Sequence, residues 1–198
     1  MSRDGKKTTI LEKEGALFKP AKVDETDTSN GFIHNSVKID TSNLNGGTLH
    51  AVDTFFVKVE GEWVELLKHN EKLDEERQTV FVPYMETSAA DSKTNDHVGT
   101  IEKEAEIYDI VTYENLANDR MYKLVGTLRY ADTGEIVKGT DGSDCVVETA
   151  LRISYRAKEV TRRLYGYLGP KDGSITMPAF KFDSSEMAGR TLVVTENL

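Results

Sequence analysis

The 198-residue sequence has a single cysteine, Cys145, and a single glutamine, Gln78. One cysteine excludes an internal disulfide framework and a cysteine-based zinc site. The four histidines lack the i, i+4 spacing of a helical metal site, so we expect neither a metal nor another cofactor. No apolar run is long enough to span a bilayer, and the first residues lack the apolar core of a signal peptide.

Positive charge is also scarce, since 34 acidic residues outnumber 25 basic ones and the formal net charge is −9. This balance argues against nucleic acid as a partner, because binding a phosphate backbone requires clustered cations. Charged residues make up 30% of the chain and apolar residues 38%, a composition typical of a globular protein with a well-solvated surface. The length allows one large domain or two small ones.

Short alternating runs of apolar and β-branched residues predict strands throughout the chain. Residues 57–60 and 63–66 flank Gly61 and predict a hairpin. The best helix candidate, Ile101–Tyr108, fits an exposed loop or an edge strand equally well. Many short strands separated by turns predict an all-β sandwich or barrel. The further strands are expected at residues 110–113, 121–125, 128–130, 150–155 and 192–194.

The chain contains an internal repeat. Residues 37–49, VKIDTSNLNGGTL, align without gaps on residues 180–192, FKFDSSEMAGRTL, and this constant shift from position 37 to position 180 is the repeat offset. Both copies read as strand, Asp- and Ser-rich turn, glycine and strand, and the matched apolar positions favour a duplication over a shared common turn. Because the chain is shorter than twice the repeat offset, we expect parts of two tandem domains, neither complete.

Three stretches of the sequence resemble the surface-protein repeats known as VaFE repeats or Thr–Gln ester-bond domains. The first, residues 108–134, contains YDIVTYENL, LVGTL and DTG. The second, residues 182–197, begins with FD and ends with GRTLVVTEN. The third, residues 68–91, contains KHNE and RQTV and continues into PYMETSAAD. Together the three stretches extend from residue 68 to residue 197.

The resemblance implies an Ig-like antiparallel β-sandwich from a Gram-positive cell-surface adhesin. In this family, a threonine on the first strand and a glutamine on the last strand form an intramolecular ester with loss of ammonia, assisted by a histidine and two acidic groups. Such help is needed because an amide is a poor electrophile and a hydroxyl is a poor nucleophile. A close pair of buried carboxyls shares a proton, and that proton also polarises the amide carbonyl.

By this resemblance, residues 1–84 are the C-terminal portion of one repeat. Asp53 takes the place of the glutamate in the family's VVFE segment, His69 is the proton shuttle and Gln78 is the electrophilic amide. Asp53 has a shorter side chain than the family's glutamate. Without the surrounding motifs, a glutamine or a histidine at such positions is more typical of a solvated surface.

Residues 85–198 are, by the same resemblance, the N-terminal and middle portion of the next repeat. Thr87 is the nucleophile, and Asp109 and Glu196 are the acidic pair. Ser88 is the alternative nucleophile if the strand register differs by one residue, because adjacent strand residues face opposite sides.

The repeat offset separates the two halves of the ester site. A glutamine for Thr87 would stand at position 221, and a threonine for Gln78 would stand before residue 1, so no complete ester site is expected within one copy of the chain. The predicted function is a structural stalk module of an extracellular, cell-wall-attached protein, with neighbouring repeats of that protein as partners. The segment is expected to lack its own signal peptide and sorting signal.

Two other functions remain open. One is a binding or stalk module of the same fold that has lost the cross-link chemistry. The other is a hydrolase that uses His69 and the acidic residues on an added substrate. The sequence disfavours an enzyme, because it contains neither a glycine-rich phosphate loop nor a nucleophile elbow. The resemblance implies autocatalytic intramolecular cross-linking as the only reaction of such a domain.

Overall fold

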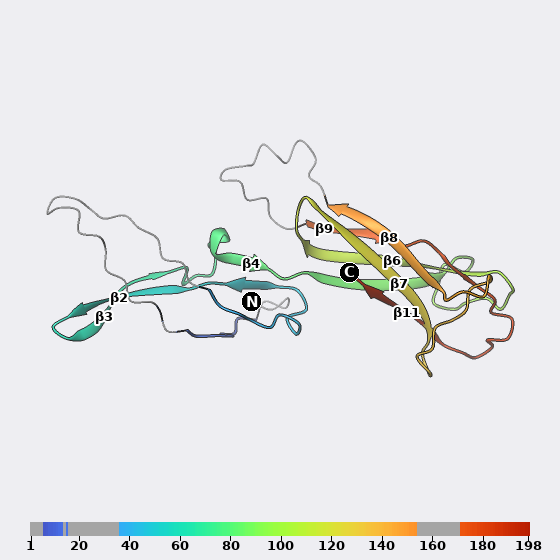
Figure 1. The fold of residues 1–198 in the computed structure, drawn as a ribbon, viewed down its shortest axis with the longest axis horizontal. Helices are drawn as coiled ribbons and strands as arrows, with labels where there is room; N and C mark the ends of the chain where they lie inside the picture. Colours follow the sequence, from blue (N-terminus) through green and yellow to red (C-terminus); the bar gives the residue numbers. More distant parts are fainter. Residues whose placement is uncertain (1–5, 14, 16–35, 154–170) are drawn as a thin grey trace. The chain divides into compact units, whose positions relative to one another are not determined.

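The computed structural model describes residues 6–13, 15, 36–153 and 171–198 (Figure 1). The chain divides into two compact units, unit 1 (Met1–Val80) and unit 2 (Phe81–Leu198). The described residues form strands and one short 3-10 helix, so the all-β prediction is confirmed. No helix in these ranges is long and apolar enough to cross a membrane.

The described residues of unit 1 form two pairs of strands. β1 (Thr48–His50) pairs with β4 (Thr79–Phe81), which follows the 3-10 helix η1 (Glu76–Gln78). β2 (Asp53–Val59) pairs with β3 (Glu62–His69). The β2–β3 hairpin turns at Glu60 and Gly61, whose φ angles of 51° and 97° are those of a two-residue hairpin turn. The predicted hairpin around Gly61 is therefore confirmed.

Unit 2 is a sandwich of two antiparallel sheets (Figure 1). In the first sheet, β6 (Ala105–Leu116) pairs with β5 (Tyr84–Asp91) along one side and with β9 (Lys171–Thr176) and β10 (Phe180–Phe182) along the other. In the second sheet, β7 (Arg120–Tyr130) lies between β8 (Val146–Ile153) and β11 (Leu192–Asn197). β5 and β11 are therefore each the last strand in the order of their sheet.

Several strands of unit 2 differ in extent from the prediction. The strands predicted at 121–125 and 128–130 form the single strand β7, because Gly126 continues the extended backbone instead of interrupting it. The helix candidate Ile101–Tyr108 is a loop followed by the beginning of β6, where Ala105 is buried against the facing sheet. The strand predicted at 150–155 begins earlier, at Val146, and its last two residues lie outside the described ranges.

The core of unit 2 lies between the two sheets and consists of two apolar clusters. Each cluster contains residues of both sheets, which confirms a sandwich. The large cluster is built from the buried residues Ala105, Leu128, Val137, Cys145, Phe180 and Phe182. The small cluster is built from the buried residues Val111, Leu124 and Met177.

The two copies of the internal repeat fold into the same turn. In unit 1, the backbone N–H and the hydroxyl of Ser42 donate to Oδ1 of Asp40 at 2.9 and 2.7 Å. In unit 2, the same groups of Ser185 donate to Oδ1 of Asp183 at 2.9 and 2.6 Å. Asp and Ser two positions apart commonly form this turn, and the two turns occupy equivalent positions of the repeat.

The backbone conformation after these turns also repeats. Gly46 and Gly189, which are equivalent positions of the repeat, have φ angles of 84° and 76°, in the left-handed region that favours glycine. A strand follows each glycine, β1 in unit 1 and β11 in unit 2. The common turn and the common glycine support the alignment of the two copies. The same repeat offset places Asp53 at the position equivalent to Glu196.

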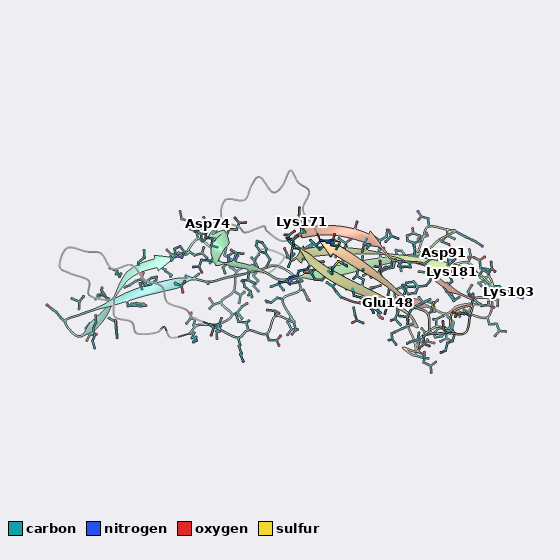
Figure 2. The ribbon with its side chains drawn as sticks, turned by 45° about the horizontal axis from the view of Figure 1, so that its top comes forward. Asp74, Asp91, Lys103, Glu148, Lys171 and Lys181 are labelled. Carbon is teal, nitrogen blue, oxygen red and sulfur yellow. The ribbon has the colours of Figure 1, made fainter. Side chains whose placement is uncertain are left out.

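One end of unit 2 is organised around a buried aspartate, Asp91 (Figure 2). Its carboxylate accepts hydrogen bonds from the backbone N–H groups of Lys93, Thr94 and Thr100 at 2.9 to 3.0 Å. Burial by itself raises the pKa of Asp91, but these hydrogen bonds outweigh burial and hold the pKa below its ordinary value. Asp91 is thus a charged residue, and its hydrogen bonds stabilise the loop that follows it, up to Thr100.

Candidate functional site

The register between β5 and β6 decides which face Thr87 occupies. Thr87 lies opposite Val111, and Ser88 lies opposite Ile110. Directly opposite residues of an antiparallel pair point to the same face. Val111 is fully buried and Ile110 is 39% exposed, so Thr87 belongs to the core-facing side and Ser88 to the outer side. Of the two alternatives for the nucleophile, this register favours Thr87, which is itself exposed at the last strand of its sheet.

Asp109 lies on the same face of the sheet, opposite Ala89 and two residues from Val111. Asp109 is 0% exposed, and neither carboxylate oxygen accepts a hydrogen bond of ordinary geometry from the residues that the structure describes. Asp91, by contrast, accepts three backbone hydrogen bonds. A buried carboxyl without such partners destabilises the fold. A buried carboxyl of this kind is a candidate for a functional residue, because it does not stabilise the fold.

Glu196 approaches Asp109 from the other sheet. It lies on β11 opposite Gly126 of β7, and Val194, two residues earlier, lies opposite the fully buried Leu128. Glu196 therefore points into the sandwich, where its Oε1 is buried and has no hydrogen-bond partner of ordinary geometry within the described part of the chain. The carboxyls of Glu196 and Asp109 each influence the pKa of the other, so the two acids form a pair between the sheets.

The surroundings of the pair favour its protonated form. Burial raises the pKa of Glu196 to about 7, and the neighbouring Asp109 carboxyl acts in the same direction. The hydroxyl of Thr87, acting as a hydrogen-bond donor to Glu196, lowers that pKa. Burial also raises the pKa of Asp109 above its ordinary value, although Glu196 and the backbone N–H groups of Ile110 and Ser88 offset part of the effect. The pair therefore keeps a proton to a higher pH than ordinary carboxyls do, with Glu196 losing its proton at about pH 7.

This arrangement can perform acid–base chemistry at a hydroxyl. A charged carboxylate next to Thr87 can accept the hydroxyl proton, and a protonated carboxyl beside it can donate a hydrogen bond to a carbonyl oxygen. Both capabilities are needed when a hydroxyl attacks an amide. Thr87, Asp109 and Glu196, which the sequence predicts for one half of the site, thus lie together in unit 2.

The other three predicted residues lie near one another in unit 1. Asp53 and His69 are opposite each other in the β2–β3 pair, and both are exposed. The backbone carbonyl oxygen of Gln78 accepts a hydrogen bond of 2.9 Å from the backbone N–H of Ala51, a residue two positions before Asp53. The buried Asn70, adjacent to His69, donates from Nδ2 to the carbonyl of Ala51 at 2.8 Å. The two predicted halves of the ester site thus lie in different units.

The sequence interpretation missed two residues that shape these half-sites. Asn70, which follows His69, donates to the carbonyl of Ala51, and the N–H of Ala51 donates to the backbone carbonyl of Gln78. Gly126 lies opposite Glu196. For Gly126 a signal exists, because a glycine inside an apolar strand often marks a close approach of another group. For Asn70 the sequence offers no comparable signal.

Replacing Thr87 by valine is expected to raise the pKa of Glu196 above about 7, because the hydroxyl that stabilises the charged carboxylate is removed. Ser88→Ala is the matched control, since it removes a hydroxyl from the adjacent residue on the outer face. The measurement is a pH titration of side-chain carboxyl carbons by NMR. Equal effects of the two variants would contradict the assignment of Thr87 to the pair.

Comparisons with known proteins identify the family of the chain. The sequence profile of the T-Q ester bond containing domain matches residues 83–197. No curated protein matches the chain. Among solved structures, the chain is similar to a bacterial adhesin from Mobiluncus mulieris described as containing intramolecular disulfide, isopeptide and ester bond cross-links. That match has 19% identity and a TM-score of 0.36 and covers 58% of this chain and 42% of the adhesin chain, less than half its length.

The matched range begins one residue before β5 and ends on the last residue of β11. It therefore includes Thr87, Asp109 and Glu196 and more than half of the 198 residues. The resemblance found in the motifs is thereby confirmed. The chain belongs to the family of T-Q ester bond containing domains.

Proposed function

We propose that unit 2 is a structural module of a bacterial cell-surface adhesin and that Thr87 forms an intramolecular ester with a glutamine side chain. The observation that carries this proposal is the pair of the buried Asp109 and the half-buried Glu196 beside the Thr87 hydroxyl. Among the described residues, both carboxylate oxygens of Asp109 and Oε1 of Glu196 lack an ordinary hydrogen-bond partner. Such buried oxygens do not stabilise a sandwich, so their presence supports a chemical role. Membership of the ester-bond family supplies the reaction.

The reaction proceeds by acyl transfer from an amide to the threonine hydroxyl. The charged member of the acid pair accepts the proton of Thr87 Oγ1 as this oxygen bonds to the amide carbon. The protonated member donates a hydrogen bond to the carbonyl oxygen and stabilises the negative charge that develops there. The carbon–nitrogen bond then breaks, and the nitrogen leaves with an additional proton as ammonia. A pKa of about 7 at Glu196 suits a group that must both hold and release a proton.

Unit 1 supplies the complementary half-site of a preceding repeat in this proposal. Gln78 is the amide of that repeat and His69 is its proton shuttle. Asp53 occupies the position that Glu196 occupies in unit 2, at the same repeat offset as the two turns. The single glutamine of the chain therefore serves a different domain from the one that contains Thr87.

An ester between the first and last strands has a mechanical purpose in such a module. Tension applied to the two ends would pass through a covalent bond, and the strands between them would be protected from unfolding. The proposal therefore places the protein outside the cell, as part of the stalk of a cell-wall-attached protein of a Gram-positive bacterium. Neighbouring repeats of the same protein are its partners.

The repeat offset provides a test that uses this sequence alone. Leu198 corresponds to Phe55, so a chain that joins residues 81–198 to residues 56–82 contains Thr87, His69 and Gln78 in the order of one complete repeat. Its intact mass is expected to be lower than the sequence mass by one ammonia. Thr87→Val and Gln78→Ala should each restore the full mass, and Ser88→Ala should not. A folded joined chain of full mass would contradict the proposed reaction.

For unit 1, one observation favours the alternative of a module without the cross-link. Asp53 is exposed and one methylene shorter than the glutamate it replaces, so it is poorly suited to form a buried pair. The joined chain distinguishes the two cases, because it combines Gln78 and His69 with Glu196 instead of Asp53. A second joined chain with Glu196→Asp would then form less ester than the first.

A further inference from the structure

We propose that Gly126 is a positioning residue for the Asp109–Glu196 pair, because the absence of a side chain at this point sets the distance between the two sheets. Gly126 lies on β7, the central strand of its sheet, with Glu196 opposite on one side and Val147 opposite on the other. Leu124 and Leu128, two residues away on either side, are buried, so the position of the missing side chain points inward.

The space next to Gly126 is filled by Phe180 of the facing sheet, by Met177, which follows β9, and by Val147 of the neighbouring strand β8. A Cβ atom at position 126 would lie 2.9 Å from Cζ of Phe180, 3.4 Å from Cγ2 of Val147 and 3.5 Å from Cε of Met177. The first distance is too short for a real contact, so either the Phe180 ring or strand β7 would have to shift. The φ angle of Gly126 is outside the left-handed region, so the backbone itself accepts alanine and only the space opposes it.

Two of the residues that fill this space, Met177 and Phe180, lie beside the part of β6 that bears Asp109. The backbone N–H of Met177 donates to the carbonyl of Asp109 at 2.8 Å. Phe180 lies opposite Ile107, two residues before Asp109 on the same face of β6. Gly126 thus lets the part of the first sheet that bears Asp109 approach the part of the second sheet that bears Glu196.

The acid pair lies between the two clusters, and this position explains why the distance between the two sheets affects the pKa of Glu196. Phe180 belongs to the large apolar cluster and Met177 to the small one, so the acid pair lies where the two clusters meet. Tight packing on both sides keeps water from the carboxyls and keeps them in contact. If the sheets separate here, both causes that raise the pKa of Glu196 become weaker.

The experiment is a double-mutant cycle on the 198-residue chain, followed by carboxyl-carbon NMR titration. Gly126→Ala is expected to move the midpoint of Glu196 downward by about one unit or more, from about 7 toward the ordinary 4.5. In a Phe180→Leu background the ring carbon that clashes is absent. There, Gly126→Ala fills the space and is expected to leave the midpoint unchanged or to raise it. Gly99→Ala is the control, since its Cβ would lie at an ordinary 3.7 Å from the nearest atom.

A midpoint that is unchanged in Gly126→Ala, or that falls equally in both backgrounds, would overturn the inference. If Gly126→Ala does not fold, the comparison within the Phe180→Leu background decides alone, and a fall there overturns it. The inference rests on the proposed function only for the chemical role that is assigned to the Asp109–Glu196 pair. Its failure is distinguishable from failure of that function, because the titration requires no ester and the mass of the joined chain requires no change at Gly126.

Discussion

Replacing Glu196 by glutamine is expected to stabilise unit 2 by about 2 kcal/mol at pH 8. The pKa of Glu196 is about 7 in the folded unit and 4.5 ordinarily, so the folded unit binds more protons between these values. The stability associated with this group is fully present below pH 4.5 and is lost as the pH rises to about 7. The magnitude is reduced for the partly exposed position of the side chain. The raised pKa of Asp109 acts in the same direction.

The measurement is denaturant unfolding of the 198-residue chain from pH 4 to pH 8, followed through NMR signals of unit 2. The wild-type free energy of unfolding should contain a component that declines across this window, and Glu196→Gln should remove it. Glu148→Gln is the matched control, because Glu148 is an exposed residue of β8 that pairs with Lys123 at 2.7 Å. Parallel profiles for wild type and Glu196→Gln would show that the pair is not protonated in the fold.

Replacing Asp109 by asparagine is expected to slow ester formation in the joined chain by at least about 10²-fold. Asparagine has nearly the same shape as aspartate, and the change removes a charge that burial disfavours, so the fold should be retained. The amide can neither accept the proton of Thr87 nor share one with Glu196. Ester formation thus loses its acid–base pair, although every other contact of the site remains.

The rate is measured by refolding the joined chain from denaturant and following the loss of ammonia by mass spectrometry. Asp183→Asn is the control, since Asp183 is an exposed turn residue of the same unit and asparagine also forms such turns. Rates that agree for Asp109→Asn and wild type would assign the proton transfers to groups other than the pair.

Much of the fold of unit 2 can be predicted from the sequence, because alternation of apolar residues is a local property. The boundaries of β7 are harder to predict, since a glycine within an apolar run usually indicates a break. At Gly126 the strand continues because both neighbouring strands, β8 and β11, bind its backbone. The pattern around Ile101–Tyr108 is ambiguous for a similar reason, because only the facing sheet provides the burial that makes Ala105 part of a strand.

For the site, the motifs identify Thr87, Asp109 and Glu196, but they contain no information on distance between the sheets. The choice between Thr87 and Ser88 required the register of β5 against β6, which no residue of β5 determines by itself. The role of Gly126 required knowledge of Phe180, which is far away in the sequence and on the other sheet. Such long-range packing is where sequence interpretation reaches its limit.

The repeated turn has a consequence for insertions and deletions. Asp40 precedes Asp53 by thirteen positions, and Asp183 precedes Glu196 by the same number. Because the turn is held by its own hydrogen bonds, it marks a fixed starting point for β11. Successive residues of a strand face opposite sides, so one residue inserted between Leu192 and Glu196 would turn the acid toward solvent. We therefore expect natural variants to differ in length in loops such as residues 131–135, and to keep the spacing from Asp183 to Glu196 unchanged.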